Sequence, residues 1–112
     1  MTNDPVRVHL LKSWPESFDA ILSGDKPFDV RVADRDYQVG DWVKLHKYDP
    51  QLKAYMGEVC YRLIGFMQPV IIAEDTWEEG IAHRWDVLHE QSVILGYSSG
   101  GHPGDNIVIV SP

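Results

Sequence analysis

The sequence predicts a small α+β fold that is mostly β, a barrel of about five or six strands with one or two short helices. Short apolar runs of alternating polarity recur along the chain, as in strands with one buried face. Turn signals rich in Gly, Pro and Asp separate these runs, and one early segment has apolar residues at helical spacing. With 112 residues, the chain has the length of one domain.

The first expected element is a half-buried strand over residues 6–12. Val8 and Leu10 are expected to point inward, whereas Arg7 and His9 alternate with them and are expected to face outward.

A helix is expected next, because residues 13–16 have the form of a capping box. The Ser13 hydroxyl would accept a hydrogen bond from an amide of the first turn, while Glu16 reaches back. Gly24 can take the left-handed conformation that ends a helix. The apolar residues of one helical face are Trp14, Phe18, Ile21 and Leu22.

Further strands follow, separated by turns. Their expected ranges are 27–32, 42–48, 55–66, 93–97 and 107–110, with a bulge at Gly57 as an option for the third. Residues 67–90 have no clear assignment: an apolar patch passes into an acidic, Trp-containing segment, with a helical turn as an option. Residues 98–106 have the composition of a linker.

The strongest functional signal is the segment 24–31. Within it, Lys26, Asp29 and Arg31 are ionisable, whereas the apolar residues of the same strand are expected to be buried. In an extended chain Asp29 and Arg31 share one face, about 7 Å apart. That arrangement indicates a ligand-facing wall, since a guanidinium binds phosphate or a base edge in a planar way. The alternative is a surface ion pair of little energetic value.

Charge and cysteine content limit the classes of function that the chain can have. The net charge of −7 argues against clamping nucleic acid by bulk electrostatics. Residues 1–66 hold nine Lys and Arg against ten Asp and Glu, while residues 67–112 hold one Arg against seven acids, so an anion site must lie in the first part. The single cysteine, Cys60, is expected in the core of a cytoplasmic protein, and no membrane span is expected.

Other candidate residues have two readings each. Lys12 borders the expected cleft or is a surface lysine, and Arg35 is a ligand or a turn residue held by its acidic neighbours. Tyr37 offers a stacking platform for a base, as does Tyr48, although core packing is the commoner fate of such rings. The five histidines lack the spacing of a zinc or iron ligand set, so no metal or other cofactor is expected.

Several short motifs occur in an order that resembles the ASCH domain, in particular an uncharacterised bacterial and phage branch. The motifs run from Pro15-Glu16 through Gly24-x-Lys26, Phe28-Asp29-Val30-Arg31, Asp34-Arg35-Asp36-Tyr37 and Val39-Gly40-Asp41 to Tyr48-Asp49-Pro50. The family signature is Gly-x-Lys-x-x-Glu-x-Arg, and here Asp29 stands in place of the glutamate.

The resemblance implies a PUA-like pseudo-barrel over residues 1–98, followed by a Gly/Ser/Pro linker and a strand-like tail over residues 99–112. It also implies a small basic cleft that binds RNA or a nucleotide. The residues expected to bind the ligand are Lys12, Lys26, Asp29, Arg31, Arg35 and Tyr37. Such binding would be weak and sensitive to salt.

Two alternatives stay open. A bacterial branch similar to this chain hydrolyses acetylated cytidine with the signature lysine, a threonine three residues later and a distant glutamate. Lys26 is present here and would be the catalytic residue of an enzyme, but Asp29 replaces the threonine, so binding is favoured over catalysis. The other alternative is a protein-interaction module with an acidic surface at 74–79, or a homodimer formed through the tail at 107–110.

Overall fold

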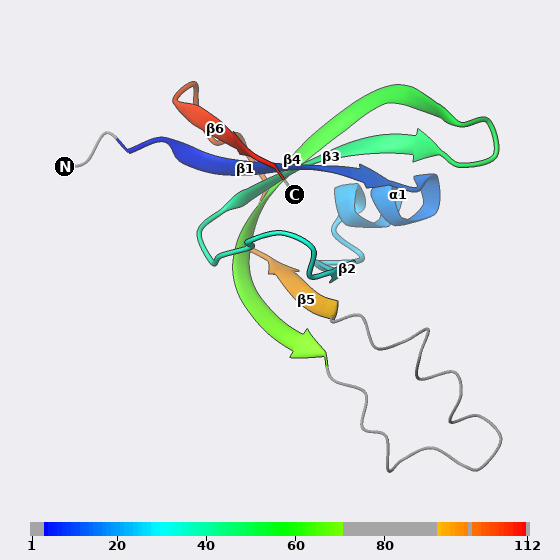
Figure 1. Cartoon of the computed structure of the whole chain (residues 1–112). Helices are drawn as coiled ribbons and strands as arrows, with labels where there is room; N and C mark the ends of the chain where they lie inside the picture. Colours follow the sequence, from blue (N-terminus) through cyan, green and yellow to red (C-terminus); the bar gives the residue numbers. More distant parts are fainter. Residues whose placement is uncertain (1–3, 71–91, 99, 112) are drawn as a thin grey trace, which may run out of the picture.

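The computed structural model describes residues 4–70, 92–98 and 100–111 (Figure 1). Six strands and one helix lie in these ranges, and the strands form a sheet of order β2-β5-β4-β3-β1-β6. The elements are β1 (Val6–Ser13), α1 (Pro15–Ser23), β2 (Phe28–Val32), β3 (Trp42–Asp49), β4 (Ala54–Val70), β5 (Ser92–Tyr97) and β6 (Ile107–Val110). The predicted mostly β α+β fold is confirmed.

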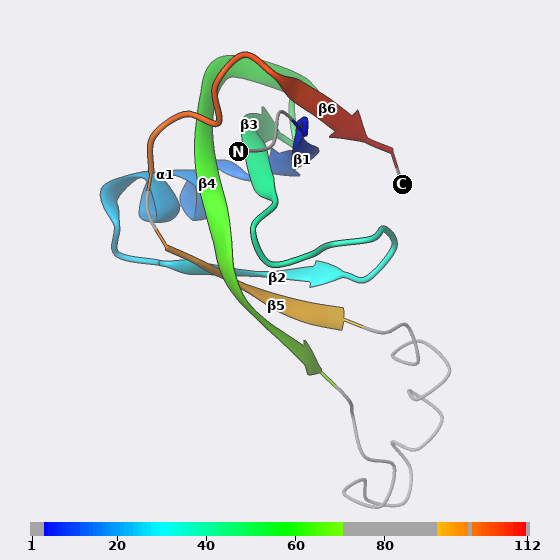
Figure 2. The ribbon, with the colours of Figure 1, turned by 90° about the vertical axis from the view of Figure 1, so that its left-hand side faces the viewer.

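The long strand β4 joins the two halves of the sheet. Its first part pairs antiparallel with β3 and its last part antiparallel with β5. The pairing is irregular around Gly57, which has a φ of +89° and is the predicted bulge position, and again at Gly65. The strand curves strongly, so that β2 and β5 lie across from β1 and β3 in both views (Figures 1 and 2). This curvature makes a partly closed barrel out of a single sheet.

Strand β1 lies between two parallel neighbours, β3 on one side and β6 on the other. Strand β6 comes from the segment predicted to be a tail, and it pairs with β1 of the same chain from Val6 opposite Ile107 to His9 opposite Val110. It ends the sheet on that side. Pairing of this edge with a second copy of the chain stays a prediction, as does a domain boundary near residue 98.

Helix α1 does not start with the predicted capping box. Its N-cap is Trp14, without a side-chain cap, and Pro15 occupies the first turn. Ser13 is instead the last residue of β1, paired opposite Lys47, so its side chain points into the protein and not along the helix. The helix ends as predicted at Gly24, which has a φ of +90°. In the described residues no helix is long and apolar enough to cross a membrane.

The core lies between the curved strands and α1. Phe18 and Ile21 are buried, whereas Trp14 and Leu22 of the predicted helix face are largely exposed. Cys60 is buried as predicted, and this burial raises the pKa of its thiol. The other buried apolar side chains are Val8, Leu11, Tyr37, Val43, Leu45, Ile64, Val93, Leu95 and Tyr97.

The predicted inward and outward directions of the β1 side chains are wrong at two positions. His9 is fully buried, whereas Leu10 is 42% exposed. The physical reason is the buried carboxylate of Asp41, whose Oδ2 lies 2.8 Å from Nε2 of His9. A polar side chain is buried at low cost when it has such a partner.

Asp41 connects three parts of the chain. In addition to the contact between Oδ2 and His9, its Oδ1 accepts a hydrogen bond from Nε of Arg7 at 3.0 Å, and its Oδ2 accepts one from the amide of Gln38 at 3.1 Å. These contacts attach the loop of residues 33–41 to the start of β1. The loop carries Arg35, so Asp41 also positions one of the candidate binding residues.

Replacing Asp41 with Asn should lower the free energy of unfolding by about 2 kcal/mol or more, because two charge-assisted hydrogen bonds are weakened in a buried setting. Urea unfolding followed by circular dichroism measures the change. Asp25→Asn is the matched control, because Asp25 is exposed and its carboxylate has no partner among the described residues. Equal stability of the two variants would contradict this role of Asp41.

Candidate functional site

Strand β2 presents its charged face to the interior and its apolar face to the outside. Asp29 is buried, whereas Phe28, Val30 and Val32 are exposed, Val30 by 53%. Asp29 and Arg31 do share one face, as the strand period predicts. The expectation that the apolar side chains are the buried ones is wrong, because the buried carboxylate of Asp29 has hydrogen-bond donors around it and so tolerates burial.

The Asp29 carboxylate holds Arg31 in one orientation. Its Oδ2 accepts hydrogen bonds from Nε of Arg31 at 3.0 Å and from the hydroxyl of Tyr97 at 3.4 Å, and it lies 2.9 Å from Nη2 of Arg31. Its Oδ1 accepts a hydrogen bond from the amide of Val30 at 3.1 Å. The remaining nitrogen of Arg31, Nη1, has no hydrogen-bond partner among the described residues. Arg31 therefore presents a fixed guanidinium with a free donor edge.

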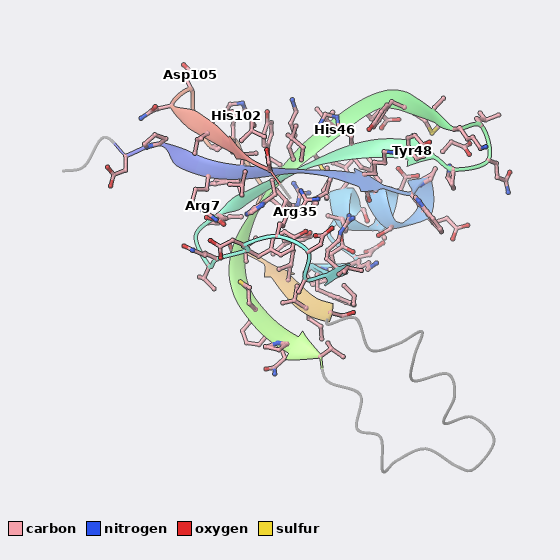
Figure 3. All side chains as sticks on the ribbon, viewed as in Figure 1. Arg7, Arg35, His46, Tyr48, His102 and Asp105 are labelled. Carbon is pink, nitrogen blue, oxygen red and sulfur yellow. The ribbon has the colours of Figure 1, made fainter. Side chains whose placement is uncertain are left out.

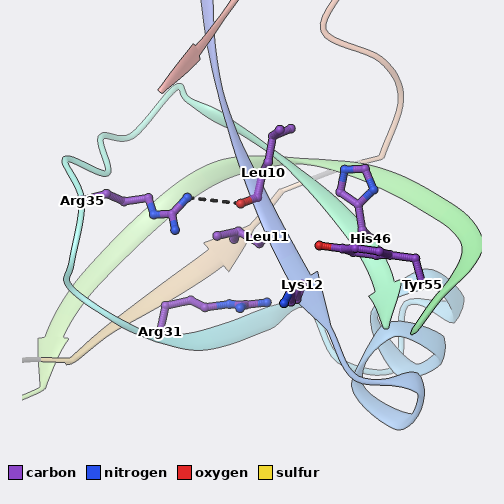
Figure 4. Close-up of a pocket in the computed structure, with 7 residues that line it drawn as sticks. All are labelled: Leu10, Leu11, Lys12, Arg31, Arg35, His46 and Tyr55. Atoms are coloured by element: carbon purple, nitrogen blue, oxygen red, sulfur yellow. Dashed lines mark hydrogen bonds between the residues drawn. The ribbon is translucent and has the colours of Figure 1, made fainter. Parts of the chain in front are cut away.

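The basic cavity is a hollow of about 560 Å³. Figure 4 shows its lining residues: Leu10, Leu11, Lys12, Arg31, Arg35, His46 and Tyr55. Three of them are cations from three separate segments (β1, β2 and the following loop), and none of the described residues that line it is Asp or Glu. The Arg31 side chain extends towards Lys12 (Figure 4). Like charges gathered in this way favour an anionic ligand.

Arg35, which lines the basic cavity, is held by the backbone carbonyl of Leu10 and by the side chain of Asp34. Its Nη1 donates to the carbonyl of Leu10 at 3.2 Å, drawn as a dashed line in Figure 4, and its Nε donates to Asp34 at 3.3 Å. Arg35 is thus a loop residue paired with its acidic neighbour, as one reading predicts, and it also lines the cavity. Ligand binding by Arg35 stays a prediction.

Two aromatic rings lie close to the ammonium of Lys12. Its Nζ lies 4.3 Å from the ring centre of Tyr48 and 5.8 Å from that of Tyr55. His46, which lies on β3 with Tyr48 (Figure 3), stacks edge-on against Tyr55 at 5.9 Å. Burial, together with the charge of Lys44, lowers the pKa of His46 from its usual 6.5, so this imidazole is neutral at pH 7.

Sequence reasoning missed His46 and Tyr55 as part of the site. Tyr55 pairs opposite Tyr48 in the ladder of β3 and β4, and His46 lies two residues before Tyr48 on β3. Alternating polarity places His46 and Tyr48 on the same face of one strand. The sequence alone does not predict the register between β3 and β4, which brings Tyr55 beside Tyr48.

A smaller hollow of about 260 Å³, the small cavity, adjoins the basic cavity and shares Lys12 and Arg31 with it. Its other lining residues are Ser13, Trp14, Ser17, Asp29 and Val30. Lys26 lies beside it, because Nζ of Lys26 donates to Oγ of Ser17 at 3.0 Å. Lys26 does not line the basic cavity.

Of the predicted binding residues, the structure brings Lys12, Arg31 and Arg35 to one cavity, with Asp29 beside Arg31. Tyr37 does not line that cavity: its ring is buried and packs against His9, with 4.7 Å between ring centres, and Cζ of Arg35 lies 5.9 Å from the centre of the Tyr37 ring. It lines a different hollow, together with Arg35 and residues of β4 and β5.

No group of three His, Cys, Asp or Glu side chains is placed to hold a metal ion in the ranges that the structure describes. The acidic segment at 74–79 lies outside the described residues, and with it lie Glu74, Glu78 and Glu79, the candidates for the distant glutamate of the hydrolysing branch. The helical turn considered for residues 67–90 also falls largely outside them, and the described part, up to Val70, belongs to β4.

Because Tyr97 and Tyr37 are buried, we expect the protein to lose stability at alkaline pH. Burial raises the pKa of Tyr97 above its usual 10.0, aided by the charge of Asp29, and burial also raises the pKa of Tyr37. Below about pH 10 both phenols are protonated in the folded and unfolded chains, so stability is complete. Above it only the unfolded chain releases these protons, and stability should fall.

Urea unfolding between about pH 8 and pH 11 measures this loss. Tyr97→Phe should make the fall with pH less steep, whereas Tyr61→Phe, a change at a partly exposed ring, should not. An equal slope in the Tyr97→Phe protein and the unmodified protein would contradict the assignment.

Comparison with known proteins supports the architecture. Residues 8–78 match a family model described as "Domain of unknown function (DUF3850)". Among solved structures, a similar one is a tyrosine-to-phenylalanine mutant of ZmASCH from Zymomonas mobilis. The two share 14% sequence identity with a TM-score of 0.53, over 86% of this chain and 73% of that one. A search of curated proteins finds no match.

The structural similarity confirms the ASCH-like fold that the motifs predict, and at this level of identity it bears on the fold alone. The family model covers β1 to β4 and hence every cation of the basic cavity. The chain thus belongs to the DUF3850 family and has the fold of an ASCH domain.

Proposed function

We propose that the protein binds single-stranded RNA or a nucleotide, with a phosphate group in the basic cavity. The observation that carries the proposal is the convergence of Lys12, Arg31 and Arg35 on one cavity that has no carboxylate among its described lining residues, in a chain of net charge −7. The carboxylates that pair with Arg31 and Arg35, those of Asp29 and Asp34, are not among the described residues that line this cavity.

Arg31 is suited to a phosphate because its orientation is set in advance. Asp29 occupies two of its nitrogens, which leaves one edge of the guanidinium to face the cavity. A planar guanidinium donates to two oxygens of a phosphate at once, and a side chain that is already ordered loses less entropy on binding. Lys12, by contrast, contributes a point charge with no ion-pair partner among the described residues.

The rings of Tyr48 and Tyr55 support a nucleotide over a simple anion. Tyr55 lines the cavity and is 60% exposed, which leaves its ring accessible. Stacking of a base on an aromatic ring contributes roughly 1–3 kcal/mol and accepts any base. The chemistry therefore favours unpaired nucleotides, whose bases are free to stack, over double-stranded RNA.

The binding test uses a fluorescent oligocytidylate of six nucleotides and measures anisotropy at low salt. Lys12→Gln should weaken binding by roughly tenfold and lower the salt dependence of log K by about 0.7, the value for one phosphate contact on a single strand. Lys53→Gln removes the same charge at an exposed turn outside both cavities and should change affinity less than twofold.

Arg31→Lys separates geometry from charge, since it keeps the cation but loses the planar pair of donors. It should weaken binding by several-fold, and circular dichroism checks that the variant is folded. Equal weakening by Lys12→Gln and Lys53→Gln would mean a diffuse surface effect, and would contradict a site in the basic cavity.

One observation keeps hydrolysis of acetylated cytidine as a second candidate. Although Asp29 replaces the threonine, Ser17 supplies a hydroxyl 3.0 Å from Nζ of Lys26. Asp29 itself is occupied by Arg31, and Lys26 lines neither the basic nor the small cavity. We therefore favour binding without catalysis.

Incubation with N4-acetylcytidine, followed by chromatography, tests this alternative. The expected result is no cytidine above the level of a Lys26→Ala control. Cytidine formation that disappears in both Lys26→Ala and Ser17→Ala would instead support hydrolysis and overturn the preference for binding.

A further inference from the structure

Ser13 lines the small cavity, and its buried hydroxyl has no partner among the described residues. Ser13 is 2% exposed, and its Oγ makes no hydrogen bond within the described residues. Most buried polar atoms in proteins are paired, because an unpaired one costs about 1–3 kcal/mol. A hydroxyl left in this state at a cavity wall indicates a group that completes it when bound.

A second set of free donors lies beside Ser13. The first hydrogen bond within α1 runs from the amide of Phe18 to the carbonyl of Trp14, so the amide of Ser17 has no acceptor inside the helix. Ser17 lines the small cavity, and the ammonium of Lys26 lies on its hydroxyl. Hydrogen-bond donors thus gather at one end of this cavity.

The third element is Trp14, which lines the small cavity although its residue is 63% exposed. The helical spacing predicts this ring on the buried face of α1, but it remains at the surface. Beside donors and a hydroxyl, an exposed indole provides a flat platform for a base.

The two cavities are lined by different residues, and this difference indicates that each would bind a different part of a nucleotide chain. Asp29 lines the small cavity and not the basic cavity, and its negative charge makes the small cavity less favourable for a phosphate than for an uncharged base. Its volume of about 260 Å³ is below the usual 300–1,000 Å³ of whole-ligand pockets and suits a single base. Lys12 and Arg31 belong to both cavities and lie where a linking phosphate would pass.

We infer that the small cavity is a base subsite that extends the phosphate site of the basic cavity, so that the ligand is a single-stranded oligonucleotide and not a free mononucleotide. The base stacks on Trp14, and its polar edge meets Ser13 and Ser17. This inference rests on the proposed function and adds the length of the ligand and the position of one base.

Two variants test the subsite with the six-nucleotide oligocytidylate and with pyrophosphate as probes. Trp14→Ala and Ser13→Ala should each weaken oligocytidylate binding by roughly three- to tenfold, and leave pyrophosphate binding unchanged. Neither change threatens the fold, because Trp14 is exposed and the Ser13 hydroxyl is unpaired. Leu22→Ala and Ser23→Ala, at exposed positions near the other end of α1, are matched controls and should bind both probes normally.

The outcomes separate the two proposals. If Lys12→Gln weakens oligocytidylate binding while Trp14→Ala and Ser13→Ala do not, the phosphate site stands and the base subsite is wrong. Binding of cytidine monophosphate as tight as that of the oligonucleotide would also overturn the subsite. If the unmodified protein binds none of these probes at low salt, the proposed function fails and the subsite fails with it.

Discussion

The ion pair between buried Asp29 and partly buried Arg31 determines which face of β2 points into the protein, and the site depends on that orientation. A carboxylate removed from water needs donors, and Asp29 has them from Arg31, from Tyr97 and from the amide of Val30. The charged face of β2 therefore turns inward, and the apolar face is left exposed at the edge of the sheet. This reversal places the Arg31 guanidinium in the wall of both cavities.

A second buried carboxylate has a comparable role at the other end of β1. Asp41 attaches the loop of residues 33–41 to β1 through Arg7 and His9, and Arg35 then reaches the carbonyl of Leu10. The positions of Arg31 and Arg35 thus depend on Asp29 and Asp41, neither of which lines the basic cavity. An acidic chain can in this way present a local positive surface, because Asp29 and Asp41 pair with other side chains and do not line the basic cavity.

Much of the fold follows from local sequence patterns. Alternating polarity predicts the strands, and Gly24 marks the end of α1 because a left-handed φ is cheap only for glycine. The shared face of Asp29 and Arg31 also follows from the strand period of two residues.

The inward or outward direction of a face does not follow from such patterns. Hydrophobicity predicts Val30 and Leu10 as buried, but tertiary pairing of Asp29 and of His9 decides otherwise. The same limit applies to the site, since Tyr55 joins Tyr48 only through the register of β3 and β4. Ser13 was predicted as a helix cap from its neighbours in sequence, whereas pairing of β1 with β3 extends through it.

The central claim is that a guanidinium fixed by Asp29 binds phosphate in the basic cavity. Nitrogen-15 spectra of the arginine Nε–H groups during titration with the six-nucleotide oligocytidylate test it directly. The signals of Arg31 and Arg35 should shift with increasing ligand, while those of Arg7 and Arg62, which do not line the cavity, stay in place. Shifts confined to Arg7 or Arg62, or no shift at Arg31 under saturating ligand at low salt, would contradict the claim.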